Sequence, residues 1–205
     1  MIDITGWEDS AEFNCWAMLC HFGGERTWQR RLTESEGRSH YRESGAYFHP
    51  FRANELGRRG TAQITPQTDS AEEFPWESMH RGGQEALLFP TTQDEQNAQG
   101  GHLQALSAVG DGRWFHITFF PSRLFKRYCG ALMVEPPQRP DFSVCREDNK
   151  QKLFGKWIEL ASYVYKRRQN RQGNQAVKFD RISGSTKRSL KANAPEDSEK
   201  REATE

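Results

Sequence analysis

The segment between residues 150 and 191 contains twelve basic residues and only two acidic ones, Glu159 and Asp180. Cations at this density neutralise phosphates and release the counterions that surround a nucleic acid, so the chemistry they suit is phosphate binding. Aromatic residues between cations can stack on unpaired bases, and Tyr163 is the one expected to be exposed. We predict nucleic-acid contacts from nine cations of this region: Lys156, Lys166, Arg167, Arg168, Arg171, Lys178, Arg181, Lys187 and Arg188.

The rest of the chain has the opposite charge. Residues 1–149 contain 15 basic and 21 acidic residues, a net charge of −6, and residues 192–205 contain two basic and five acidic residues, a net charge of −3. The total of +1 therefore conceals a basic segment of +10, and such asymmetry is typical of proteins that bind nucleic acid or acidic surfaces. The alternative is that the basic segment contacts only the acidic residues of its own chain.

Cysteine and histidine side chains near the N-terminus could bind a metal or act as nucleophiles. Cys15, Cys20 and His21 form one group, with His40 and His49 downstream. A structural zinc site needs a second ligand pair, which the sequence does not contain as a recognisable unit. Neither cysteine lies at the start of its expected helix, where a thiolate would be stabilised. We therefore predict reduced thiols, no metal site and no cofactor.

The segment 23–31 (GGERTWQRR) resembles the G-E-R-R box of ParB-like nucleotide-binding and nuclease domains, with Thr27 inserted between the arginines. The resemblance implies that Gly24 and Arg26 approach a phosphate and that Glu25 assists the chemistry. It covers nine residues, and we assign no family from it. This segment is the main candidate if the protein is an enzyme that acts on nucleic acid.

Other nuclease and nucleotide-binding patterns are missing. The acidic residues are scattered, and Glu135, at the end of an expected strand, is followed by two prolines rather than by a lysine. The chain contains neither G-x-x-x-x-G-K nor G-x-G-x-x-G, the glycine-rich loops that bind phosphates. His116 is expected on the polar face of a strand rather than in acid–base chemistry.

The elements that must position these residues indicate an α+β fold. A small antiparallel meander is expected near residues 103–135, with strands at 103–109, 114–120 and 129–134. Helices are expected at 10–22, 27–36 and 141–168, the last with Trp157 and Tyr165 on its apolar face. The polar segment 90–101 is predicted to be a loop.

This interpretation divides the chain into a globular domain, residues 1–168, and a flexible tail, residues 169–205, of which 183–205 are expected to be disordered. Only 35% of residues are hydrophobic and the mean hydropathy is −0.92, and no apolar run is long enough to cross a membrane. The N-terminal sequence has no secretory signal pattern. We expect a cytoplasmic protein, or a nuclear one in a eukaryotic or viral setting.

The function we predict is non-catalytic nucleic-acid binding by an accessory or regulatory protein, with DNA and RNA both open as partners. The first alternative is a protein–protein adaptor or inhibitor that docks through its acidic, aromatic-bearing body. The second alternative is an enzyme that processes nucleic acid. No membrane partner is expected.

Overall fold

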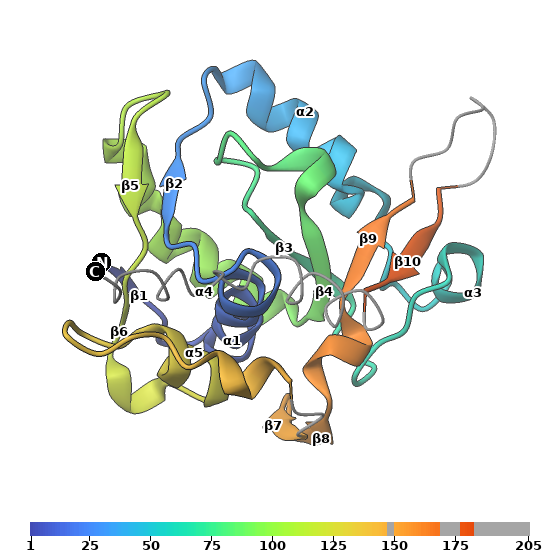
Figure 1. Cartoon of the computed structure of the whole chain (residues 1–205). Helices are drawn as coiled ribbons and strands as arrows, with labels where there is room; N and C mark the ends of the chain where they lie inside the picture. The colour runs from blue at the N-terminus through green and yellow to red at the C-terminus, as the bar shows by residue number, and fades with distance from the viewer. Residues whose placement is uncertain (147–149, 169–176, 183–205) are drawn as a thin grey trace, which may run out of the picture.

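Helix α1 (Glu8–Trp16) runs through the middle of the fold, and the other elements lie around it (Figure 1). The structure is a computed structural model that describes residues 1–146, 150–168 and 177–182. Every residue from Ser10 to Trp16 is buried, as expected of a helix that neighbouring elements cover on all sides. The helix continues as a π-helical turn, Ala17–His21, so the prediction of a helix at 10–22 is confirmed.

One four-stranded sheet packs against α1, and it is antiparallel throughout (Figure 1). Its strands, in spatial order, are β10 (Phe179–Arg181), β9 (Tyr165–Arg167), β4 (Leu87–Thr91) and β3 (Ser70–Phe74). All five residues of β4 are buried, and Phe89 stacks on Phe13 of α1 with 5.0 Å between the ring centroids. Strand β3 is an edge strand, so one of its sides has no neighbouring strand.

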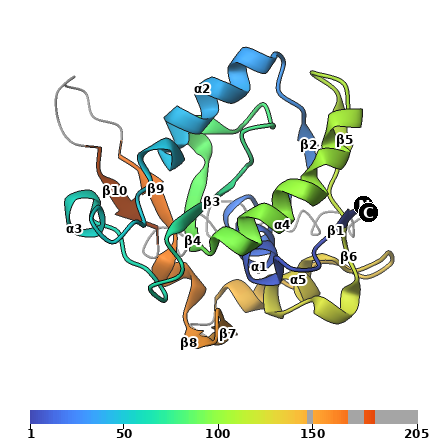
Figure 2. The same ribbon diagram turned by 180° about the vertical axis from the view of Figure 1, so that it is seen from behind.

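Three two-stranded ribbons, four more α-helices and several short 3₁₀ helices complete the described part of the chain. The ribbons are β1 (Ile2–Asp3) with β6 (Phe119–Phe120), β2 (Thr27–Gln29) with β5 (Trp114–His116), and β7 (Gln151–Leu153) with β8 (Lys156–Ile158). The helices are α2 (Glu34–Ser44), α3 (Leu56–Arg59), α4 (Gln93–Leu103) and α5 (Arg127–Leu132). Figure 2 shows α2 and α4 near the free edge of β3. The α+β class predicted from the sequence is confirmed.

The polar segment 90–101 is not the predicted loop, because most of it forms α4. The hydroxyl of Thr92 caps the helix by accepting a hydrogen bond from the backbone N–H of Glu95. The glycine pair that suggested a loop lies inside the helix. A good cap and contacts with the rest of the fold outweigh the weak helix propensity of glycine at these positions.

The predicted meander at 103–135 is also wrong. Residues 104–108 form a 3₁₀ helix, and the last expected strand, 129–134, begins within α5. The segment 114–120 is extended, but it splits into β5 and β6, which pair with β2 and β1. Helix α5 forms because the buried carboxylate of Glu12 accepts hydrogen bonds from the backbone N–H groups of Tyr128 and Cys129 in its first turn.

The expected amphipathic helix 141–168 is replaced by a short 3₁₀ helix (Phe142–Cys145), the β7–β8 hairpin and β9. The hairpin reverses at Phe154 and Gly155, whose φ angles of 48° and 74° belong to the left-handed region that tight hairpin turns require. Trp157, expected in the core, is consequently 69% exposed, whereas Tyr165 is buried as predicted.

The helix expected at 27–36 is strand β2 followed by α2, which begins after Thr33 caps it. Strand β10 (Phe179–Arg181) follows residue 168, where the domain boundary was expected, and pairs with β9. The division into a domain and a tail stays a prediction. The predicted disorder at 183–205 lies outside the described residues. No described helix combines the length and apolar character that a membrane span requires.

The four cysteines form two disulfides rather than the reduced thiols expected from the sequence. Cys15 of α1 is bonded to Cys129 of α5, and Cys20 is bonded to Cys145. Both bonds connect the central helix and its π-helical turn to the segment 127–145. A zinc site or a nucleophilic thiol built from these cysteines is therefore absent from the structure.

The Cys15–Cys129 bond closes a loop with a sequence separation of 114 residues, and such a bond restricts the unfolded chain. We expect the double substitution Cys15→Ala and Cys129→Ala to lower the free energy of unfolding by about 2–5 kcal/mol. Urea denaturation without reductant measures this, and mass spectrometry verifies that the second disulfide remains. An unchanged denaturation midpoint would contradict the expectation.

Candidate active site

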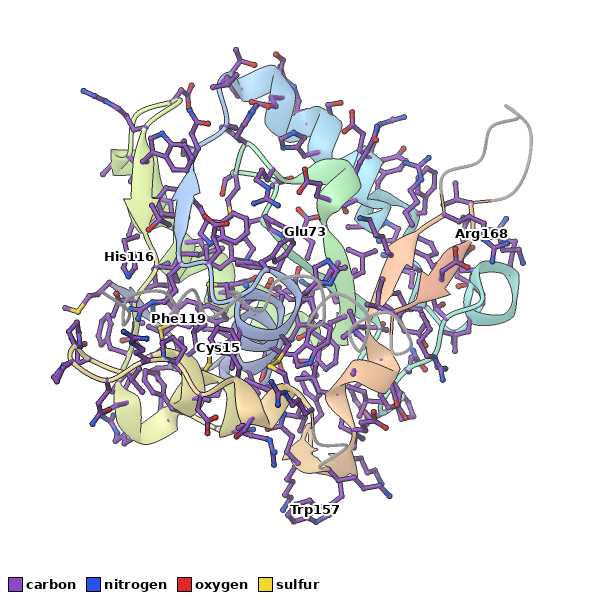
Figure 3. All side chains as sticks on the ribbon, viewed as in Figure 1. Cys15, Glu73, His116, Phe119, Trp157 and Arg168 are labelled. Atoms are coloured by element: carbon purple, nitrogen blue, oxygen red, sulfur yellow. A yellow bond between two sulfur atoms is a disulfide. The ribbon has the colours of Figure 1, made fainter. Side chains whose placement is uncertain are left out.

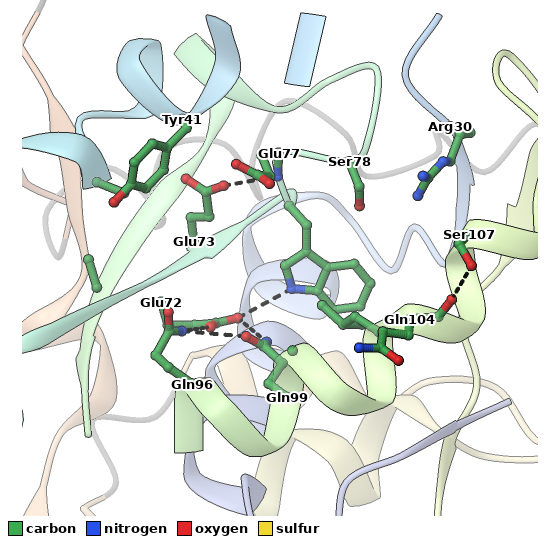
Figure 4. A pocket seen from close by; sticks show the side chains of 15 residues that line it. Arg30, Tyr41, Glu72, Glu73, Glu77, Ser78, Gln96, Gln99, Gln104 and Ser107 are labelled. Carbon is green, nitrogen blue, oxygen red and sulfur yellow. Dashed lines mark hydrogen bonds between the residues drawn. The ribbon is translucent and has the colours of Figure 1, made fainter. Parts of the chain in front are cut away.

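A cavity of about 450 Å³ lies along the free edge of β3 and extends to α4 (Figure 4). Strand β3 contributes Glu72 and Glu73 to its wall, and α4 contributes Gln96 and Gln99. Consecutive side chains of a strand point to opposite faces, so one cavity reaches both glutamates only by wrapping around a free strand edge. The position of β3 at the end of the sheet therefore makes this arrangement possible.

The carboxylate of Glu72 is held by donors from α4 and from the loop that follows β3 (Figure 4). Gln96 and Gln99 donate from their Nε2 atoms at 2.6 and 2.5 Å, and Trp76 donates from Nε1 at 3.3 Å. Burial raises the pKa of Glu72 to about 7, although the donors from Gln99 and Trp76 lower it. Glu72 therefore exchanges a proton near neutral pH while its orientation is fixed.

The neighbouring carboxyl group, Glu73, lies on the other face of the strand (Figure 4). The hydroxyl of Ser44 donates to it at 2.6 Å, and the backbone N–H of Glu77 donates at 2.9 Å. Burial raises its pKa to about 8, and the nearby charges of Glu77 and Glu72 act in the same direction. Glu73 is consequently protonated at pH 7 more often than Glu72.

The opposite wall of the cavity has a positive charge. Arg30 follows β2 and is 9% exposed, and its Nε lies 3.8 Å from Oδ1 of Asp111. This Nε has no hydrogen-bond partner among the described residues, and burial lowers the pKa of the guanidinium from its ordinary value. Arg30 therefore places a guanidinium beside a cavity whose other wall contains the two glutamates.

These groups match the requirements of phosphodiester hydrolysis. Two carboxyl groups that titrate near neutrality can act as a base and an acid, and a guanidinium can stabilise the charge of the phosphoryl group. Within residues 1–146, 150–168 and 177–182, no three histidine, cysteine, aspartate or glutamate side chains gather in a way that could hold a metal ion.

Those cations predicted to bind nucleic acid that the structure describes do not line this cavity. Lys156 lies on β8, Lys166 and Arg167 on β9, and Lys178 and Arg181 at or beside β10, whereas Arg171, Lys187 and Arg188 lie outside the described residues. Figure 3 shows Arg168 at the periphery, away from Glu73. Their role in binding stays a prediction.

Some of these cations already have partners within the protein. Arg168 donates from Nε to Asp180 at 3.0 Å, and Arg167 donates to the backbone carbonyl of Arg42 at 2.7 Å. Tyr163, expected to be exposed for stacking, packs against the main core instead. The alternative that the basic segment contacts acidic residues of its own chain therefore applies to Arg168, whereas the partner of Arg167 is a backbone carbonyl.

The segment 23–31 contains no catalytic arrangement of the kind the G-E-R-R resemblance implied. Arg26 donates to the backbone carbonyl of Ile117 at 3.1 Å and to the hydroxyl of Thr118, and Glu25 pairs with Arg81 at 3.5 Å. Arg30, at the end of the same segment, is the residue that reaches the cavity. His116 lies on β5 and is exposed, as predicted.

The sequence analysis did not identify Glu72 and Glu73. One signal was present: two adjacent glutamates in the run SAEEFPW, next to aromatic residues that indicate burial. A carboxylate pair with one buried and one half-buried member is a stronger indication of acid–base chemistry than the number of acidic residues in the chain.

One comparison with known proteins finds a relationship. The family model described as deoxyribonuclease NucA/NucB matches residues 14–118. No curated protein and no solved structure matches the chain. The matched region includes every residue that lines the cavity and excludes the basic segment 150–191.

The raised pKa of Glu73 predicts a loss of stability at high pH. Since its pKa in the folded protein, about 8, lies above the ordinary value of 4.5, its stabilising contribution is complete below pH 4.5 and is lost as the pH rises through 8. We expect Glu73→Gln to reduce the fall in unfolding free energy between pH 5 and 9 by at least about 1 kcal/mol. Urea denaturation across this range measures the change.

The matched control is Glu34→Gln, which removes a carboxylate that is 76% exposed on α2. Glu12 and Glu95 also have pKa values of about 7, but neither is coupled to Glu73, so they titrate alike in parent and variant and cancel in the comparison. Equal pH dependence in parent and Glu73→Gln would mean that Glu73 ionises normally.

Proposed function

We propose that this chain, which belongs to the deoxyribonuclease NucA/NucB family, hydrolyses the phosphodiester bonds of DNA in the cavity beside β3. The observation that carries the proposal is the pair Glu72 and Glu73, with pKa values of about 7 and 8, on the wall of a cavity that lies entirely within the family match. Carboxyl groups with such values exchange protons efficiently near neutral pH.

The family match corrects two predictions made from the sequence. The non-catalytic accessory role is contradicted, and so is the expectation that the protein is more likely not an enzyme. The second alternative, an enzyme that processes nucleic acid, agrees with the family. Nucleic acid remains the partner, with DNA rather than RNA indicated, and a regulatory role has no support.

In the mechanism that we propose, Glu72 is the general base. The amide and indole donors around Glu72 favour its ionised form, and its pKa is the lower of the two. The carboxylate accepts a proton from a water molecule whose oxygen attacks the phosphorus atom. Glu72 remains oriented during this transfer because three side chains hold it, two on α4 and one on the loop that follows β3.

Glu73 is the general acid. As the new phosphorus–oxygen bond forms and the ester bond breaks, protonated Glu73 donates its proton to the leaving oxygen. The products are a phosphate monoester and a free hydroxyl group, and solvent returns both carboxyl groups to their starting states. Arg30 faces the negative charge that grows on the phosphoryl oxygens.

The two disulfides favour an oxidising compartment for this activity, because structural disulfides are rare in the cytosol. The cytoplasmic location expected from the sequence stays an untested prediction. Binding of a protein partner likewise stays a prediction.

The test is the pair of substitutions Glu72→Gln and Glu73→Gln, which keep the shape of each side chain and remove its proton exchange. We expect each to lower kcat on a defined DNA oligonucleotide by at least about 100-fold. Product formation is followed by gel electrophoresis, with and without MgCl2 and MnCl2, and circular dichroism verifies folding. The control, Glu34→Gln, retains the activity of the parent.

The pH–rate profile separates the two roles. In the parent, kcat rises as Glu72 ionises near pH 7 and falls as Glu73 loses its proton near pH 8, so the profile is a narrow bell. In the Glu73→Gln variant, the activity that remains does not decrease near pH 8, because the group assigned to that decrease is absent. Parental kcat in either folded glutamine variant contradicts the proposed mechanism.

A further inference from the structure

A second cavity of about 210 Å³ adjoins the first and extends it past Glu73. The two share four lining residues: Tyr41, Ala46, Ala71 and Gln96. Figure 4 shows Tyr41 on the Glu73 side of the active-site cavity, away from Arg30. Because the residues between them are shared, the two cavities form one cleft rather than separate sites.

The second cavity has the groups that an anion requires. Arg52 lines it, is exposed, and makes no side-chain hydrogen bond or ion pair within the described part of the chain. Burial raises the pKa of Tyr41, and the positive charge of Arg52 opposes that rise; burial lowers the pKa of His49, and Arg52 lowers it further. Both side chains line the same cavity, so the charge of Arg52 acts across the space. Gln93 and Ser70 add neutral donors to the wall.

A polymeric substrate places a charged group there. A DNA strand carries a phosphate on each nucleotide, so the phosphate next to the scissile one must lie somewhere along the protein surface. We infer that the second cavity binds this neighbouring phosphodiester, with Arg52 as its cation, and that the cleft thereby accepts a single strand of DNA longer than a dinucleotide. The inference rests on the proposed function, because the scissile phosphate is assigned to the first cavity.

One group in the second cavity opposes the anion. The carboxylate of Asp69 lines the wall, is exposed, and carries the same sign of charge as a phosphate. The subsite therefore contains one attractive and one repulsive charge, and it should bind a phosphate with modest affinity. Removing the attractive charge of Arg52 should therefore weaken phosphate binding, and removing the repulsive charge of Asp69 should strengthen it.

The experiment compares two substrates of single-stranded DNA. The dinucleoside monophosphate TpT has only the scissile phosphate, whereas a thymidine pentanucleotide also has neighbouring phosphates. We expect Arg52→Ala to raise KM for the pentanucleotide by roughly five- to tenfold, with the change confined to KM, because it removes a charge-assisted contact. Asp69→Asn lowers the same KM, and neither substitution changes KM for TpT.

The matched control is Arg58→Ala. Arg58 is also an exposed arginine close to this region, but it pairs with Glu55 and does not line the cleft. Dinucleotides with an added 5′- or 3′-phosphate then identify the side of the scissile bond that Arg52 contacts, since only one of them should bind more tightly to the parent than TpT.

Equal KM values for the pentanucleotide in the parent and in Arg52→Ala would overturn the inference, and so would an equal change with TpT. A direct binding measurement separates this failure from failure of the proposed function. Fluorescence anisotropy of a labelled phosphorothioate pentanucleotide, whose linkages keep their negative charge and are cut slowly, reads the subsite on the parent and on Arg52→Ala. Weaker binding to Arg52→Ala supports the subsite even if Glu73 proves not to be catalytic, and unchanged binding contradicts it.

Discussion

The withdrawal of four carboxyl groups from water is the constraint on which this structure depends. Glu12, Glu72, Glu73 and Glu95 all have pKa values raised by burial, to between about 7 and 8. Such groups are tolerated in an interior only when donors satisfy them, and here each carboxyl group accepts at least one hydrogen bond from another element. Glu12 accepts from the first turn of α5, Glu95 from the first turn of α1, Glu72 from α4, and Glu73 from the last residue of α2. The contacts that orient the helices are thus the contacts that set the proton affinities.

The sequence predicts the class of the fold but not the placement of its elements, for reasons that are physical. The helix at residues 10–22 is recognised because its apolar residues recur at helical spacing. Helix α4 is missed because only its cap at Thr92 and its tertiary contacts stabilise it, and its composition is that of a loop. The expected helix at 141–168 fails because the left-handed turn at Phe154 and Gly155 interrupts a pattern that otherwise has helical periodicity. Local patterns cannot reveal which competing contact is stronger.

The sequence did not indicate the active-site residues for a related reason. Net charge directs attention to the basic segment, since phosphate attracts cations over long distances. The family match and the cavity lie instead in the region whose formal charge is −6. That formal charge overstates the repulsion of a phosphate, because Glu73 is largely protonated at neutral pH and Glu72 is partly so. The chemistry follows from the environment of a few side chains, and that environment exists only after strands and helices from distant parts of the chain have packed together.

The disulfides have a topological consequence for a protein with this architecture. Both bonds join a residue before β2 to a residue after β6, so the whole cavity-forming segment, from Arg30 to Ser107, belongs to a covalently closed ring. A single cut of the backbone anywhere between residues 21 and 128 leaves two pieces that remain one molecule. The exposed loops around the cleft can therefore be nicked by a protease without releasing either wall of the cavity, provided that the surroundings remain oxidising.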